Sequence, residues 1–169
     1  MERAQRDNKT IGSVIAPVEL LSDFRNWPEV SYDYLFINQS QDKPEKPAVV
    51  FGEDVLTYRE LELQSRQWAY WLLSKGLKRG GKVLVCMERA LELPAVLLGI
   101  LRAGACYVPA DPAFPPDRIA VIIEDSDSAA VISDRQNEGL LPPNNPSVHF
   151  VVEDKPSQLE AQTLPEWNP

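Results

Sequence analysis

The sequence is poor in the side chains that metal sites and histidine-based catalysis require. Its 169 residues include one histidine, His149, and two cysteines, Cys86 and Cys106. A zinc site or a catalytic triad needs partner residues that the sequence does not supply, so we expect His149 to be an ordinary strand residue. The two cysteines are far apart within apolar stretches, and we expect buried free thiols, neither a disulfide nor a metal pair.

Long apolar runs and a clustered basic surface are also missing. The residues after Met1 are polar and charged, and nowhere do about 18 consecutive apolar residues occur, so we expect neither a signal peptide nor a membrane span. The formal net charge is −8. This charge disfavours a nucleic-acid partner, because nucleic-acid binding depends on clustered lysine and arginine. We therefore expect a soluble, cytoplasmic protein.

The negative charge is concentrated in the last third of the sequence. Residues 111–169 carry 11 acidic and three basic side chains, whereas the first 110 residues carry 14 of each. An acidic docking surface is one interpretation. A solvated helix face followed by an acidic tail is the interpretation that we favour.

The glycine patterns do not include a nucleotide-phosphate motif. No Gly-x-Gly-x-x-Gly sequence occurs, so the sequence lacks the motif that is typical of dinucleotide-binding proteins. Gly99 and Gly104 have the spacing of a P-loop, but Ala105 and Cys106 stand where that loop needs Lys and Ser or Thr. The pattern also ends a predicted helix, whereas a P-loop precedes one.

Hydrophobic periodicity predicts strands that alternate with helices. We expect strands at residues 48–52, 82–87, 106–108, 129–133 and 148–152, and helices at 58–75, 90–103 and 116–126. A shorter helix is predicted from Tyr34 to just before Lys43, and a loop from Gly139 to Ser147. Such alternation indicates an α/β fold with a mainly parallel, doubly wound sheet and flanking helices.

The clearest local signal lies before the helix predicted at residues 58–75. The stretch from Thr57 to Glu60 is a capping box, in which threonine and glutamate side chains satisfy amides of the first helical turn. Leu61, Trp68 and Leu72 recur at helical spacing and predict a core-facing stripe. We expect the neighbouring aromatic residues to pack in the core, with one exposed, and not to form a base-stacking platform.

Two stretches carry a resemblance to a known family. The sequence Leu56–Leu61 resembles the first core motif of the adenylation domains of non-ribosomal peptide synthetases, which belong to the AMP-dependent synthetase/ligase, or adenylate-forming, superfamily. Residues 101–112, which read LRAGACYVPADP, resemble the second core motif. The match continues through residues 114–119 and covers roughly residues 34–134. The resemblance implies the N-terminal part of the large subdomain of an amino-acid-activating enzyme.

The resemblance also implies a reaction and its cofactors. In this family a carboxylate reacts with ATP, in the presence of magnesium, to give an acyl-adenylate and pyrophosphate. The acyl group then passes to the phosphopantetheine thiol of a carrier domain. The implied partners are therefore the remainder of the adenylation domain and a carrier domain, whereas neither nucleic acid nor membrane is expected.

No catalytic, metal-binding or identifiable cofactor-binding residue can be carried over from the family. Its two motifs in this sequence are scaffold, so we assign no ATP contact to Thr57, Tyr58, Arg102 or Asp111. We expect Asp111 to cap the loop that follows it. The family's Gly-, Ser- and Thr-rich phosphate loop is expected soon after the last predicted strand, but the sequence ends at Pro169 without it.

These observations predict three segments and leave three interpretations open. We expect a poorly structured leader at residues 1–30, a partial adenylation domain at 31–153 and a tail at 154–169. The favoured interpretation is an N-terminal fragment that is inactive alone. One alternative is the adenylating region of an aminoadipate-reductase-like enzyme, whose sequence is similar to residues 111–118. Two further alternatives are an enzyme half that associates with a separate chain and a non-enzymatic interaction module that retains the fold.

Overall fold

The computed structural model describes residues 32–143 and 148–155. Contacts divide the chain into Met1–Val30 and Ser31–Pro169, and every element named below belongs to the second unit. The predicted leader lies outside the described residues, as does the predicted tail from residue 156 onward. Within the described ranges, no helix is long and apolar enough to cross a membrane.

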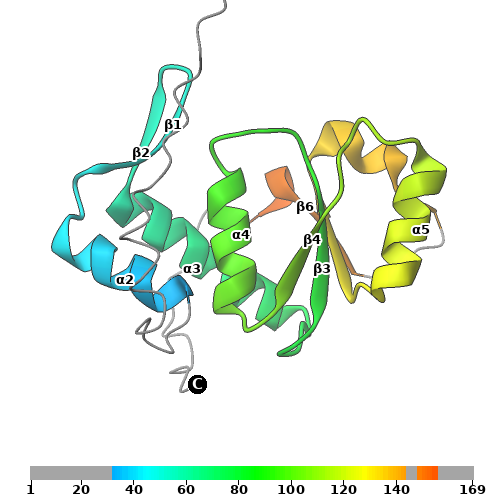
Figure 1. The fold of residues 1–169 in the computed structure, drawn as a ribbon, viewed down its shortest axis with the longest axis horizontal. Helices are drawn as coiled ribbons and strands as arrows, with labels where there is room; N and C mark the ends of the chain where they lie inside the picture. The colour runs from blue at the N-terminus through cyan, green and yellow to red at the C-terminus, as the bar shows by residue number, and fades with distance from the viewer. Residues whose placement is uncertain (1–31, 144–147, 156–169) are drawn as a thin grey trace, which may run out of the picture. The chain divides into compact units, whose positions relative to one another are not determined.

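Four parallel strands form the central sheet (Figure 1). The strand β3 (Lys82–Cys86) lies between β4 (Cys106–Pro109) and β5 (Ala130–Ser133), and β6 (Val148–Val151) pairs with β5. The chain therefore passes from β3 to β4 on one side and then crosses to β5 on the other. This order confirms the predicted α/β fold with a parallel, doubly wound sheet.

Three helices flank the sheet close to their predicted positions. They are α3 (Tyr58–Ser74), which precedes β3, α4 (Leu93–Arg102), between β3 and β4, and α5 (Pro116–Ser126), between β4 and β5. The helix α4 begins three residues later than predicted, and Pro94 lies in its first turn, where a missing amide costs little. A further helix, α2 (Tyr32–Asp42), matches the prediction that it ends before Lys43.

The two faces of β3 pack against different helices. Val83 and Val85 belong to the core formed with α3 and α4, whereas Leu84 and Cys86 belong to a second core formed with α5. All four side chains are buried because successive residues of a strand point to opposite faces and both faces are covered. This double burial explains the nearly continuous apolar run in the sequence.

The predicted strand at residues 48–52 does not belong to the parallel sheet, and that expectation was wrong. The strand β1 (Pro47–Phe51) pairs antiparallel with β2 (Asp54–Thr57), which the sequence analysis did not predict. Gly52, with φ +63°, lies in the two-residue turn between them. Val50 is 66% exposed, so this strand is not fully buried despite its apolar composition.

The capping box forms as predicted at the start of α3. The backbone N–H of Thr57 donates to Oε2 of Glu60 over 2.8 Å, and the backbone N–H of Glu60 donates to Oγ1 of Thr57 over 3.3 Å. At the other end of the helix, Gly76 adopts φ +91° and stops it. The turn that follows leads directly into β3.

The aromatic residues of α3 pack mainly in the core. Trp68 is fully buried and Trp71 nearly so, with ring centroids 5.1 Å apart. Trp71 also meets Phe150 of β6 edge to face, with centroids 4.9 Å apart. Tyr70 is only partly buried. These contacts confirm the core interpretation, because neither tryptophan presents an exposed face for stacking on a base.

Two residues of α4 hold it against α3. A Cβ atom added at Gly99 would overlap the Cβ of Trp68 and lie 3.0 Å from the carbonyl oxygen of Ser65, so the helices approach closely there. Three residues later, the guanidinium of Arg102 donates to Oγ of Ser65 over 3.0 Å and to Oε1 of Glu62 over 3.1 Å. The Arg102 side chain is only 9% exposed and serves helix packing.

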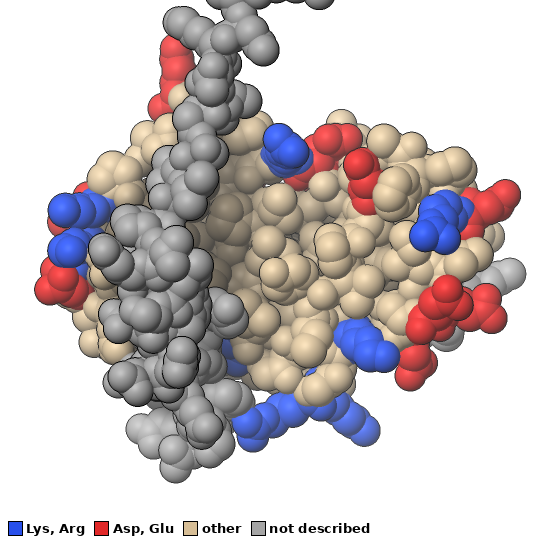
Figure 2. Space-filling model, in the orientation of Figure 1, with Lys and Arg blue, Asp and Glu red and all other residues tan. Residues whose placement is uncertain are grey.

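Acidic side chains gather over α5 (Figure 2). Asp117, Glu124 and Asp125 of this helix are exposed, whereas Ile119 and Ile123 face the core. The helix is therefore amphipathic, which agrees with the predicted solvated helix face. No docking role is required to explain its charge.

Replacing Thr57 with alanine should lower the free energy of unfolding by about 1 kcal/mol, because the first turn of α3 loses its cap. Chemical denaturation of the purified chain measures this change. Thr57→Ser retains the hydroxyl and should remain close to the native chain. Equal stability of the alanine and serine variants would contradict the capping role.

Stability should also depend on pH through Glu60. Hydrogen bonds from the backbone and then the side chain of Thr57 hold the pKa of Glu60 below its usual value of 4.5. A group whose pKa is lower in the folded state contributes stability above its unfolded pKa and loses it as pH falls. The stability difference between the native chain and Glu60→Gln should therefore shrink between about pH 6 and about pH 3. Glu53→Gln, in the β1–β2 turn, is the matched control.

Replacing Gly99 with alanine should destabilise the chain by about 1–3 kcal/mol, because the added methyl group would force α3 and α4 apart. Gly139→Ala is the matched control, since a Cβ there meets nothing within 4 Å and the backbone has no positive φ. Thermal unfolding of both variants compares them directly. A Gly99→Ala variant as stable as Gly139→Ala would contradict the close approach of the helices.

Candidate functional site

The candidate site is the edge of the sheet where the parallel strands end. In doubly wound sheets, ligands bind outside the carboxyl ends of the strands, next to the point where the strand order reverses. Here the order reverses between β3 and β5. The loop from Met87 to Glu92 follows β3, and Asp134 follows β5, so these residues occupy the position expected for a site.

Asp134 connects the loops after the two central strands. Its Oδ2 accepts a hydrogen bond from the backbone N–H of Glu88 over 2.9 Å, and its Oδ1 accepts one from that of Asn137 over 3.0 Å. The second bond caps a short 3₁₀ helix, η2 (Arg135–Leu140), which the sequence analysis did not predict. Both carboxylate oxygens of Asp134 are therefore bonded to backbone amides.

Hydrogen bonds and an ion pair connect the segment that follows β6 to the same region. The backbone N–H of Arg135 donates to both carboxylate oxygens of Glu153, over 3.2 and 3.0 Å. The guanidinium of Arg135 also pairs with the carboxylate of Asp154. These contacts fix the exit of β6 next to η2, where the 3₁₀ turn η3 (Val152–Asp154) forms.

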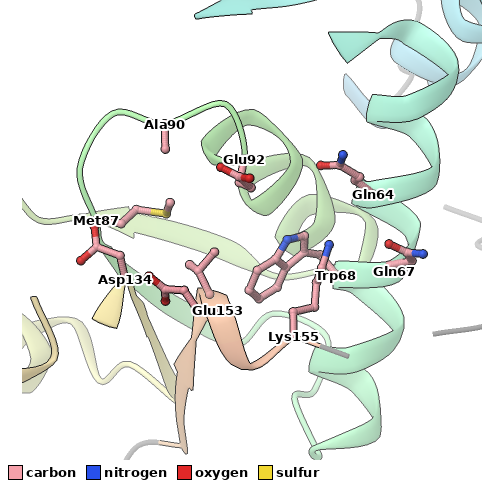
Figure 3. A pocket seen from close by; sticks show the side chains of 10 residues that line it. Gln64, Gln67, Trp68, Met87, Ala90, Glu92, Asp134, Glu153 and Lys155 are labelled. Carbon is pink, nitrogen blue, oxygen red and sulfur yellow. The ribbon is translucent and has the colours of Figure 1, made fainter. Parts of the chain in front are cut away.

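A pocket of about 490 Å³ opens between this edge and α3 (Figure 3). We call it the Trp68 pocket, and its walls include Gln64, Trp68, Met87, Glu92, Val152 and Lys155. The residues come from α3 and from the loops after β3 and β6. The pocket therefore joins segments about 90 positions apart in the sequence.

Lys155 and Glu92 bring opposite charges to this pocket. The Nζ atom of Lys155 lies 5.5 Å from the centroid of the Trp68 ring, in a cation–π contact. Burial lowers the pKa of Lys155 from its usual value, and the carboxylate of Glu92 partly opposes that shift. Within the described residues, the two charges do not form an ion pair.

The residues singled out in the two sequence motifs have structural roles. Oδ1 of Asp111 accepts a hydrogen bond from the backbone N–H of Ala113 over 2.9 Å, which confirms its predicted loop-capping role. Thr57 caps α3, and Arg102 lies against α3. Gly99 faces α3, and Gly104, with φ +72°, lies beyond the end of α4. None of these residues lines the Trp68 pocket, although Gly99 packs against Trp68.

The cysteines and the histidine do not form a reactive cluster. Burial, reinforced by the carboxylates of Asp134, Asp111 and Glu88, raises the pKa of Cys86 to about 11. Cys106 is a free thiol, as predicted, but it is exposed, so the expectation that it is buried was wrong. It is exposed because it lies on β4, an edge strand that is only partly covered.

His149 lies on β6, as a strand residue, with its Nε2 atom 2.9 Å from Oγ of Ser133. Burial lowers the pKa of His149, although the carboxylates of Glu138 and Asp154 oppose the shift. Ser133 is fully buried, so a substrate cannot reach its hydroxyl. Among the described residues there is no group of three or more His, Cys, Asp or Glu side chains that could hold a metal ion.

The Trp68 pocket was not predicted from the sequence. Trp68 was assigned to the core, and Lys155 fell in the predicted tail. Glu92 stood inside the helix predicted from residue 90, although the structure places it just before α4. The only available signal was the position of residues 88–92 and 152–155 immediately after predicted strands, where ligand-binding loops occur in this fold class.

The chain resembles proteins of one enzyme family in sequence. The pattern of the family described as AMP-binding enzyme matches residues 36–168. A plipastatin synthase from Bacillus subtilis (strain 168) is 37% identical over 132 residues, which are 78% of this chain and 5% of that protein. The chain therefore spans a small part of the length of this relative.

Solved structures resemble the chain in fold as well. A nonribosomal peptide synthetase in its α-methyl-L-serine-AMP-bound form matches with a TM-score of 0.74 and 28% identity, over 79% of this chain and 15% of that one. An artificially fused adenylation–PCP di-domain from Klebsiella oxytoca matches with a TM-score of 0.69 and 25% identity, over 76% of this chain and 24% of that one. Since the family pattern also covers most of the sequence, the chain belongs to the AMP-binding enzyme family.

Proposed function

We propose that this chain forms the N-terminal part of an adenylation domain that activates an amino acid. In the first step the carboxylate of the substrate attacks the α-phosphorus of ATP, and pyrophosphate leaves. In the second step a phosphopantetheine thiol attacks the acyl carbon of the adenylate, and AMP leaves. The observation that carries this proposal is the likeness in fold and sequence to a synthetase solved with α-methyl-L-serine-AMP.

The described residues do not fit ATP and magnesium by themselves. The carboxylates of Asp134 and Glu153 already accept backbone amides, and the described residues hold no cluster of metal-ligating side chains. Neither Gly99 nor Gly104 begins a helix that could receive a phosphate group. We therefore place the nucleotide contacts outside the described residues and assign to these residues the role of scaffold.

A carrier domain is the proposed partner of the domain to which this chain contributes. The likeness to the adenylation–PCP di-domain supports this assignment. The relatives reported above are peptide synthetases, which favours this interpretation over an aminoadipate-reductase-like enzyme. No contact in the described residues specifically supports an interaction module without enzymatic activity.

The purified 169-residue chain should show no amino-acid-dependent exchange of pyrophosphate into ATP, because its described residues provide no phosphate-binding contacts. Incubation with radiolabelled pyrophosphate, ATP and a mixture of the proteinogenic amino acids measures this directly. A complete adenylation domain of a relative, assayed in parallel, is the positive control. Exchange above the no-enzyme background would contradict the assignment of this chain as scaffold.

A further inference from the structure

The neutral form of His149 satisfies a buried hydroxyl group on the neighbouring strand. Ser133 is fully buried, and its Oγ atom lies 2.9 Å from Nε2 of His149. Within the described residues, this contact is the only hydrogen bond of the Ser133 hydroxyl group. A neutral imidazole accepts a hydrogen bond at one ring nitrogen, whereas a charged one donates at both. The Ser133 O–H group therefore has an acceptor only while His149 is neutral.

This contact anchors an edge strand. Among the described strands, β6 lies at one edge of the sheet and pairs only with β5 (Figure 1). Val131 is the backbone partner of His149, and Ser133 lies two residues further along β5, so the two polar side chains are on the same face of the sheet. Because β6 has ladder hydrogen bonds to a single neighbour, a side-chain hydrogen bond to that neighbour is a large part of its attachment.

Two carboxylates attract the ring of His149 once it is charged. They are those of Glu138 in η2 and Asp154 in η3, and both favour the imidazolium form. Glu138 forms no ion pair within the described residues, whereas Asp154 is paired with Arg135. Protonation therefore replaces the hydroxyl partner of the ring with carboxylate partners that belong to the segments after β5 and β6.

The other described groups on this face of the sheet keep their charge state near neutral pH. Cys86 is the backbone partner of Ser133, and burial, reinforced by nearby carboxylates, raises its pKa to about 11, so its thiol stays neutral. The helix α5 contributes Ile119 and Ile123 to the core on this face, and its acidic side chains are exposed. His149 is therefore the group here whose charge changes between about pH 5 and pH 8.

We propose that His149 is a pH-sensitive switch that holds β6 on the sheet while its ring is neutral and releases the strand once the ring is charged. The release is a local opening of β6 and not unfolding of the chain. Phe150, the next residue of β6, packs edge to face on Trp71, so the opening exposes both rings. The segment that follows β6 lines the Trp68 pocket, so the opening also widens this pocket.

The direction of the pH effect follows from the surroundings of the ring. Burial lowers the pKa of His149 below its usual value of 6.5, and the carboxylates of Glu138 and Asp154 only partly oppose this shift. The open strand, whose ring is solvated, therefore binds a proton more readily than the closed strand. Since a fall in pH favours the state that binds more protons, β6 should open increasingly below pH 6.5.

Nuclear magnetic resonance of the native 169-residue chain tests the anchoring contact without any variant. His149 is the only histidine, so its ring C–H signals are assigned directly. The ring should titrate with a pKa below 6.5. Ser133→Ala should raise this pKa, because the neutral ring loses its hydrogen-bond donor. A native pKa at or above 6.5, or an unchanged pKa in Ser133→Ala, would overturn the proposal.

Hydrogen exchange of the backbone amides tests the release of the strand. Between about pH 7.5 and about pH 5.5, protection of the β6 amides, corrected for intrinsic exchange rates, should fall about fivefold or more, as expected for the loss of one side-chain hydrogen bond. Protection of the β3 amides in the centre of the sheet should change little. His149→Gln is the matched variant, because its amide can still bond to Ser133 but does not titrate, and its β6 protection should be equal at the two pH values.

Two exchange results would contradict the switch. One is an equal loss of protection in β3 and β6, because the chain would then unfold as a whole. The other is the same loss in His149→Gln as in the native chain, because a different group would then be responsible. The switch uses the described residues alone, so neither result would bear on the pyrophosphate-exchange assay.

Discussion

The close approach of α3 and α4 at Gly99 determines much of the rest of the structure. The absence of a side chain at this position lets the two helices share one apolar face over Val83 and Val85 of β3. The same contact fixes Trp68 at the end of the sheet, where one side of its ring becomes a pocket wall. Arg102 reinforces the contact with hydrogen bonds to the neighbouring turn of α3.

The hydrogen bonds at the carboxyl edge have a different role. They connect loops that follow different strands, through Asp134 between β3 and β5 and through Glu153 between β5 and β6. Because each bond joins a carboxylate to a backbone amide, it fixes the path of the main chain and occupies an amide donor that could otherwise bind a phosphate group. This arrangement suits the scaffold role that we propose for these residues.

Sequence reasoning succeeded where the determining interactions are local. The capping box of α3 lies within four residues, and the apolar run of β3 reflects burial on both faces, so each pattern could be read directly. It failed at β1, because an apolar strand looks the same whether it joins the central sheet or a separate hairpin. The difference depends on Gly52 and on the pairing of Phe51 with Asp54.

The pocket could not be read from the sequence for a related reason. Gln64 and Lys155 are separated by the whole sheet in sequence, and only the strand order brings them together. The family resemblance did not help here, because its motifs concern the helices and strands and not this edge.

The unequal exposure of the two cysteines leaves one accessible thiol for chemical labelling. At neutral pH the thiol of Cys86 is buried and protonated, whereas that of Cys106 is open to solvent at the start of β4. A maleimide-linked fluorophore or spin label should therefore attach at one position without any engineering of the sequence. A probe placed there would lie on an edge strand of the central sheet, where it could report the arrival of any neighbouring domain at that edge.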